Sequence, residues 1–310
     1  MTLSTAHAMD AWPRLAKLLV AARNKGPAKT GIVFPMSETS LRAAVQAHRQ
    51  GLIEAIMYGP SAALLELAKK HDIDLTDIAI IDTPAEAIAC AAQAVADCKK
   101  GELAALMKGS LHTDELLAPV VARDTGLRTD RRISHLFVFD VPSYPKLLMV
   151  ADAVVNIAPD LKSKFSIVQN AIDAAHKIGV DNPKVAILAA VEMVQENIPA
   201  TKDAEALLAM AAEGKITGGI LGGPFGFDNA VSKRAALIKG IASPVAGDAD
   251  ILITPDLNAG NILYKSLIYM AGAECAGVVL GTSVPIILTS RADSETCRVA
   301  SCALASLLAN

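Results

Sequence analysis

Short apolar runs alternate with helix-like stretches along almost the whole chain. Ten runs rich in Val, Ile, Leu and Ala are predicted to be strands that are apolar on both faces. Such strands need cover on both sides, which is typical of parallel sheets with helices on each face. The predicted strands are residues 31–34, 54–59, 78–81, 103–109, 135–140, 184–190, 218–223, 249–255, 276–281 and 285–290.

The stretches between these runs have the apolar spacing of amphipathic helices. They contain no internal repeat and no low-complexity segment. Strands that alternate with helices in this way predict the α/β fold class. The clearest predicted helices are residues 10–26, 161–178, 202–213, 229–240, 258–271 and 294–308.

Two segments are the predicted crossings between domains. The first is the polar, Arg-rich stretch Arg123–Arg132, and the second lies near Gly277–Pro285. The chain is expected to leave a first domain, build a second and return. We predict two α/β/α domains with mainly parallel sheets and an interdomain cleft. Domain I comprises residues 1–128 and 278–310, and domain II comprises residues 129–277.

The composition excludes several classes of protein. Aromatic residues make up 4% and the formal net charge is −3, without a basic block, which excludes a nucleic-acid-binding surface. No apolar run has the length of a membrane span, and no signal-peptide pattern is present. Five cysteines without a C-x-x-C pair favour reduced thiols and argue against a structural zinc site. We therefore expect a cytoplasmic protein without nucleic-acid or membrane partners.

Ligands in open α/β sheets bind beyond the carboxyl ends of the strands, and the last predicted strand ends in a polar segment. This strand ends at Thr289; Ser290 and Arg291 come next, and Asp293 or Ser294 can cap the helix that follows. A guanidinium, a hydroxyl and free N–H groups at one place predict an anion site. An ordinary strand–loop–helix junction with a solvated Arg explains the same residues.

A second polar loop follows the predicted strand 249–255. Asn258 and Asn261 flank Gly260, which allows a ligand to approach the backbone, and Lys265 lies on the helix that follows. Asn258 as a helix cap is the alternative interpretation. Two amides, a carboxylate at Asp256 and a lysine within ten residues favour a binding loop.

Two further segments are weaker candidates. Gly223 and Pro224 lie in a glycine-rich segment that is predicted to be a loop after a strand, and such a loop can hold phosphate or form a tight turn. Lys108 and Gly109 follow another strand, and His112 starts the next helix. Neither H-E-x-x-H nor G-x-S-x-G is present, so metal hydrolysis and Ser-His-Asp catalysis lack support.

Together these four segments resemble the phosphate acetyltransferase and phosphate butyryltransferase family. The resemblance runs from about residue 99 to the C-terminus and is weaker before that. The motifs that carry it are MKGSLHT, KVAILAAVEMVQENIPATKDA, GPFGFDNAVS, SPVAGDADILITPDLNAGNILYK and VPIILTSRADS.

The resemblance implies direct acyl transfer between coenzyme A and inorganic phosphate in a two-domain protein. It implies a short acyl group (acetyl to butyryl), coenzyme A as a substrate and no metal or other cofactor. A homodimer or larger homo-oligomer is also implied. The family's functional Ser-Arg pair falls on Ser290 and Arg291, and its Asn/Gly/Lys loop falls on Asn258, Gly260, Asn261 and Lys265.

Two departures from the family pattern affect the predicted mechanism. Cys297 stands where acetyltransferases have an Asp that is proposed to take the thiol proton, and Ala118 stands where an Arg is expected. The thiol of coenzyme A has a pKa of about 8.5, so its thiolate needs a base or a cation. Asp293 and Glu295 are the candidate bases, and Cys297 is more simply a core residue.

Two other functions compete with this prediction. One is a metal- and NAD-dependent decarboxylating dehydrogenase on a similar scaffold. The other is a non-catalytic module that binds coenzyme A, which the two departures favour.

Overall fold

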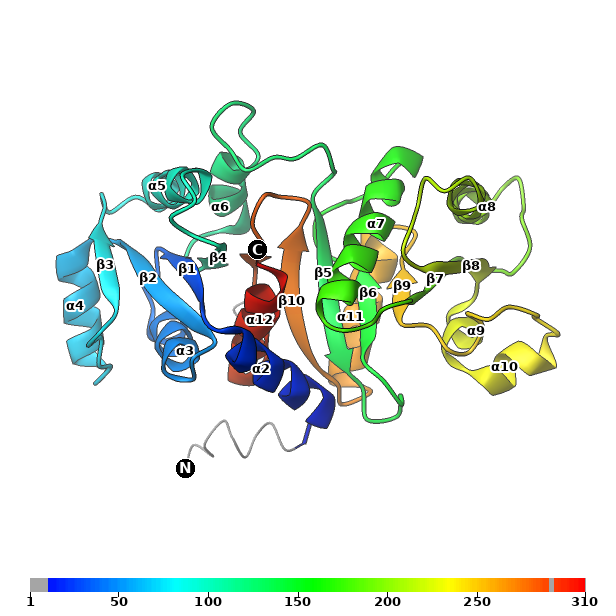
Figure 1. Ribbon diagram of the computed structural model, residues 1–310, viewed down its shortest axis with the longest axis horizontal. Coiled ribbons are helices and arrows are strands. Elements are labelled where there is room, and N and C mark those ends of the chain that lie inside the picture. Colours follow the sequence, from blue (N-terminus) through cyan, green and yellow to red (C-terminus); the bar gives the residue numbers. More distant parts are fainter. Residues whose placement is uncertain (1–10, 290–292, 310) are drawn as a thin grey trace. The chain divides into compact units, whose positions relative to one another are not determined.

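The computed structural model describes residues 11–289 and 293–309, and its elements are labelled in Figure 1. The chain divides into two compact units. Unit 1 is Met1–Arg131 with Ala276–Asn310, and unit 2 is Arg132–Cys275. The predicted boundaries after residues 128 and 277 differ from these by three and two residues.

Unit 1 contains a mainly parallel sheet. Strand β4 lies between β1 and β11, and all the strand pairs among β1, β2, β3, β4 and β11 are parallel. Only β10, which begins with the last two residues of unit 2, pairs antiparallel with β11. The strand order is β3 (Ala79–Asp82), β2 (Ile53–Gly59), β1 (Ala28–Val33), β4 (Ala105–Lys108), β11 (Ile286–Ile287) and β10 (Glu274–Leu280).

Helices cover both faces of this sheet (Figure 1). Met57 of β2 belongs to a core cluster with residues of α3, α4 and α12, while its neighbour Tyr58 bonds to Asp97 of α5. Successive residues of a strand point to opposite faces, so α5 covers the face away from α3 and α12. The helices are α2 (Pro13–Lys25), α3 (Glu38–Arg49), α4 (Ser61–Lys70), α5 (Ala87–Lys99), α6 (Thr113–Val120) and α12 (Glu295–Leu308).

Unit 2 is built in the same way around five strands. Strands β6, β9, β7 and β8 are parallel, and β5 forms an antiparallel pair with β6. The strand order is β5 (Ser134–Asp140), β6 (Leu148–Ala151), β9 (Ile251–Ile253), β7 (Lys184–Leu188) and β8 (Ile220–Phe225). The helices are α7 (Leu161–Lys177), α8 (Pro199–Ala212), α9 (Phe227–Val231), α10 (Lys233–Ile238) and α11 (Leu257–Tyr269).

The α/β prediction is confirmed, and three details of it are wrong. Strand β6 was not predicted, because it has only four residues and follows β5 in a hairpin. The predicted helix 229–240 is broken at Ser232, whose backbone is extended and whose Oγ accepts the N–H of Ala235 as the cap of α10. The strand predicted over residues 218–223 continues through Pro224 to Phe225 as β8, so this part of the glycine-rich segment is not a loop.

Among the described residues, no helix is long and apolar enough to cross a membrane.

A buried carboxylate ties α5 to the sheet of unit 1. Asp97 is buried and accepts hydrogen bonds from the Tyr58 hydroxyl at 2.9 Å, from Lys100 at 2.9 Å and from Gln93 at 3.1 Å. Burial acts to raise its pKa, but the hydrogen bonds from Lys100, Gln93 and Tyr58 outweigh it, so the pKa of Asp97 is lowered. A lowered folded-state pKa means that the carboxylate stabilises the fold above its unfolded pKa, about 3.9, and loses this effect as the pH falls through the folded value.

We predict that Asp97→Asn lowers the free energy of unfolding by about 1–3 kcal/mol at pH 6, because charge-assisted hydrogen bonds are lost. The difference from wild type should shrink as the pH falls below about 4, because the unfolded carboxylate takes up a proton there while the folded carboxylate is protonated only at lower pH. Urea unfolding between pH 3 and 7 measures it, with Asp181→Asn at an exposed position as the control. A difference that does not vary with pH would contradict the account.

Candidate active site

Parallel pairing brings two of the predicted polar segments to one edge of the unit 1 sheet. Lys108 ends β4 opposite Val33 of β1, and Ile287 of β11 lies opposite Met107 of β4. The carboxyl ends of β1, β4 and β11 therefore meet at the edge where α/β proteins bind ligands. Thr289 is buried two residues after the end of β11.

A pocket of about 360 Å³ opens at this edge, and those of its lining residues that the structure describes belong to unit 1. The structure places three predicted residues together in it: Lys108, Gly109 and Thr289. The described lining residues are Ser37, Thr39, Ser40, Met107, Lys108, Gly109, Ser110, Thr289 and Arg298.

The pocket has a cationic wall built from two buried side chains. Lys108 is 9% exposed, and its ammonium group donates to the carbonyl of Leu111 at 3.0 Å. Arg298 is 7% exposed and lies in the first turns of α12. Gly109 is needed beside them, because a Cβ there would lie 2.3 Å from the carbonyl oxygen of Val33.

Sequence reasoning missed the hydroxyl-bearing wall of this pocket. Ser37 caps α3, and its Oγ accepts the N–H of Ser40 at 3.3 Å. The segment PMSETS after the first predicted strand could have indicated it, because a serine in this position is typical of a helix N-cap. Arg298 was missed because nothing in the sequence shows that its helix is buried along almost its whole length.

The segment with the predicted Ser-Arg pair lies next to Thr289. Ser290 and Arg291 are outside the described residues, so their catalytic roles stay predictions. Asp293 is partly buried, but the cap of α12 is Ser294, whose Oγ accepts the N–H of Cys297 at 2.8 Å.

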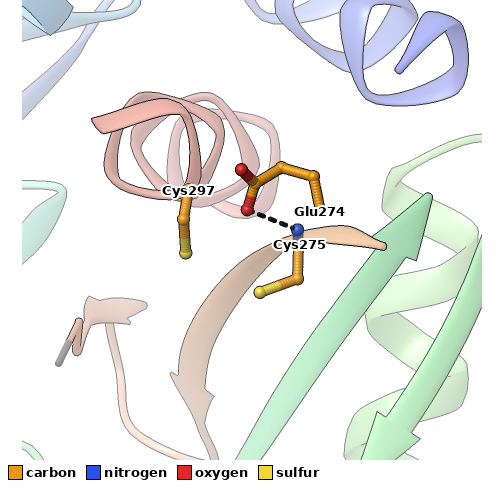
Figure 2. Close-up of side chains that lie close together, drawn as sticks. All are labelled: Glu274, Cys275 and Cys297. Carbon is orange, nitrogen blue, oxygen red and sulfur yellow. Dashed lines mark hydrogen bonds between the residues drawn. The ribbon is translucent and has the colours of Figure 1, made fainter. Parts of the chain in front are cut away.

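Cys297 is a buried residue of α12, 2% exposed, which supports its interpretation as a core residue. Figure 2 draws it with Glu274 and Cys275, and there the Glu274 carboxylate accepts the N–H of Cys275 at 3.0 Å. Carboxylate and thiol groups are metal ligands in general, but Glu274 and Cys275 belong to unit 2 and Cys297 to unit 1. This grouping therefore supports no metal site.

The second predicted loop forms the start of α11 in unit 2. Asp256 is its N-cap and accepts the N–H of Ala259 at 3.0 Å. The alternative that Asn258 caps the helix is wrong. Asn258 and Lys265 are exposed and lie seven residues apart, so they share one face of α11.

Gly260 and Asn261 fix α11 against the chain that follows β6. The Asn261 amide donates to the carbonyl of Ala153 at 3.3 Å. A Cβ on Gly260 would lie 2.4 Å from the carbonyl oxygen of Asp152. The backbone that approaches Gly260 closely is thus the protein's own, which explains the glycine without a ligand, and its role in substrate binding stays a prediction.

Gly223 and Pro224 lie in β8, which β7 separates from β9, the strand that leads into α11. Gly223 has φ of +150°, and a Cβ there would lie 2.8 Å from the carbonyl oxygen of Ile187 in β7. This glycine is therefore explained by strand packing, and the role of the pair in substrate binding stays a prediction.

Comparison with known proteins identifies the family. The model of the phosphate acetyl/butaryl transferase family matches residues 85–306. The chain belongs to this family.

Relatives of this transferase family match the chain over nearly its whole length. A phosphate acetyltransferase of Rhizobium meliloti is 52% identical and covers 96% of this chain and 95% of its own. A phosphate butyryltransferase of Clostridium acetobutylicum is 36% identical, with 94% of this chain and 97% of its own covered. The crystal structure of a branched-chain phosphotransacylase from Enterococcus faecalis V583 has a TM-score of 0.78 at 27% identity, covering 91% of this chain and all of its own.

We predict that Gly260→Ala destabilises the protein by about 3 kcal/mol, because the new methyl group meets backbone atoms that cannot rotate away. Urea unfolding measures the loss. Gly179→Ala, also in unit 2, is the control: its φ of +89° costs about 1 kcal/mol, but nothing lies within 4 Å of the added Cβ. Equal losses for the two variants would show that Gly260 does not pack against Asp152.

Proposed function

We propose that the chain transfers a short acyl group reversibly between coenzyme A and inorganic phosphate. The observation that carries this proposal is the 52% identity to a phosphate acetyltransferase over nearly the full length of both chains. The pocket in unit 1 supports it, because buried Lys108 and Arg298 provide the positive charge that a phosphoryl group requires.

The acyl group is proposed to be acetyl to butyryl, with acetyl as the best substrate. The acetyltransferase relative is more similar to this chain than the butyryltransferase relative, at 52% against 36% identity. Both activities nevertheless occur among relatives that match nearly the whole chain.

The proposed reaction is direct attack of the coenzyme A thiolate on the carbonyl carbon of the acyl phosphate. The C–S bond forms, the C–O bond to phosphate breaks, and the phosphate leaves with the bonding electron pair. Asp293, Glu295 or water takes the thiol proton. Arg291 stays protonated and, with Ser290, stabilises negative charge on the carbonyl oxygen and the leaving phosphate.

Acyl transfer through a cysteine of the protein is not favoured. All five cysteines lie in the described part of the chain, and all are buried. Desolvation raises the pKa of Cys98 and Cys302 to about 12, so these thiols do not form the nucleophilic thiolate near neutral pH. Bringing both substrates together provides much of the acceleration in direct transfer.

No metal or other cofactor takes part in the proposed reaction, and coenzyme A is a substrate. The dehydrogenase alternative needs a divalent metal and a nicotinamide, and the family match does not favour it. The non-catalytic alternative rests on Cys297 and Ala118 and requires that coenzyme A binds without turnover.

The protein is further proposed to be a cytoplasmic homodimer, and the interdomain cleft stays a prediction.

An exposed apolar face of α11 is the proposed dimer interface. Ile262 and Tyr269 lie on this face, and Met270 follows the helix; their exposed fractions are 66%, 73% and 87%. Exposed apolar side chains grouped in this way are typical of subunit interfaces. Analytical sedimentation of Tyr269→Asp tests this face. If the variant forms a dimer as stable as that of the wild type, the face is not the subunit interface.

We predict phosphate-dependent release of free coenzyme A from acetyl-, propionyl- and butyryl-CoA, fastest with acetyl-CoA, when the three are assayed in parallel. The rate should not change in EDTA and should require no nicotinamide. Loss of activity in EDTA that a divalent ion restores would contradict the metal-free reaction. Binding of coenzyme A without any release would select the non-catalytic alternative.

Arg291→Lys is the informative variant in the same assay. A lysine keeps the charge but loses the planar fork that binds phosphate through two hydrogen bonds, so activity should fall at least tenfold while the fold is kept. Wild-type turnover by a folded Arg291→Lys protein would show that Arg291 does not act on the phosphoryl group.

A further inference from the structure

Three serine hydroxyls meet in the unit 1 pocket although they come from two distant segments. The Oγ of Ser40 lies 2.9 Å from that of Ser37 and 3.0 Å from that of Ser110, and the Oγ of Ser110 lies 2.9 Å from that of Ser37. Ser37 and Ser40 belong to the start of α3, and Ser110 follows β4. We propose that this serine cluster (Ser37, Ser40 and Ser110) is the subsite for the phosphoryl group of the acyl phosphate.

This proposal rests on the proposed function and names residues for one of its substrates. The pocket's donors suit a phosphoryl oxyanion, a group that inorganic phosphate, acyl phosphate and the phosphates of coenzyme A share. The experiment below separates these sources.

The protons of the serine cluster can be counted. Three hydroxyls have three protons, and that of Ser40 is donated to the carbonyl of Ser37 at 3.0 Å. The protons of Ser37 and Ser110 remain for contacts within the cluster. Hydroxyl protons rotate freely about the C–O bond, so both can turn to an oxyanion in the pocket.

The surroundings of the serine cluster are positive. Buried Lys108 and Arg298 line the same pocket, and none of the described lining residues is acidic. The first N–H groups of a helix have no partner within the helix and favour an anion, and Thr39 in the first turn of α3 also lines the pocket.

The nearest acidic residue on α3 does not oppose this charge. Glu38 in the first turn is not part of the pocket lining. Its carboxylate binds Arg42 at 2.8 Å and His71 at 3.0 Å instead.

A phosphoryl group matches this set of donors. Its three terminal oxygens accept several hydrogen bonds at once, and hydroxyls, backbone N–H groups and cations all provide them. The hydroxyls contribute direction and the two cations contribute charge. The thiol of coenzyme A and the acyl chain are weakly polar, so neither would be bound well by hydroxyl donors and cations.

The test compares Ser110→Ala and Ser40→Ala with wild type. Each variant removes one hydroxyl from the subsite, so the KM for inorganic phosphate and for acetyl phosphate should rise about tenfold or more. The KM for coenzyme A should stay within about twofold of wild type. Ser110→Thr, which keeps the hydroxyl, should restore most of the affinity for phosphate.

Ser306→Ala is the matched control. It removes a buried serine hydroxyl of unit 1 that donates to the carbonyl of Gly26 at 3.2 Å, near the other end of α12. Its loss should affect stability but not the KM for phosphate. Ser110 is only partly buried, so Ser110→Ala continues the test if Ser40→Ala does not fold.

Two results would overturn the subsite. One is an unchanged KM for phosphate in folded Ser110→Ala, and the other is a rise in the KM for coenzyme A alone, which would assign the pocket to a coenzyme A phosphate. Titration of the proteins with inorganic phosphate alone separates this proposal from the proposed function. If the wild-type protein does not transfer acyl groups, the proposed function is refuted. Weaker binding of phosphate to Ser110→Ala than to wild type would still support the subsite in that case.

Discussion

The parallel pairing of β4 with β1 and β11 is the constraint on which the site in unit 1 depends. Because Lys108 lies opposite Val33 and Met107 lies opposite Ile287, three strands end at one edge of the sheet. A shift of one residue in β4 would turn Lys108 to the other face of the sheet. The register of β4 against its neighbours, more than any single hydrogen bond, therefore positions Lys108 beside the serine cluster.

The cost of this arrangement is electrostatic. Lys108 and Arg298 are both more than nine-tenths buried, and a buried charge is expensive unless charged or polar groups surround it. Helix α12, whose residues from Thr296 to Leu308 are all buried, holds Arg298 in place. Such preorganised charge is what a reaction needs when negative charge moves from an acyl phosphate to a leaving phosphate.

Much of the fold could be predicted because the strands of a covered parallel sheet are continuous apolar runs. Strand β6 was missed because it is short. The continuation of β8 through Pro224 was missed because glycines are typical of loops, whereas Gly223 packs against Ile187 of β7. The site was harder to predict for a related reason. Ser37 and Ser110 are 73 residues apart, and they meet only because of the register of β1 and β4.

The sequence motifs predicted which segments meet in one pocket better than they explained single residues. Lys108, Gly109 and Thr289 were predicted as binding residues and lie in one pocket. Gly260 was predicted for closeness to a ligand but is explained by closeness to Asp152, since a sequence does not show which backbone a glycine faces.

Direct transfer, without an acyl group on the protein, is the central claim of the proposed mechanism. The most direct measurement incubates the protein with acetyl phosphate and radiolabelled inorganic phosphate and leaves out coenzyme A. Direct transfer predicts that no label enters acetyl phosphate until coenzyme A is added. Labelled acetyl phosphate in the absence of coenzyme A would reveal an acyl-enzyme and contradict the account.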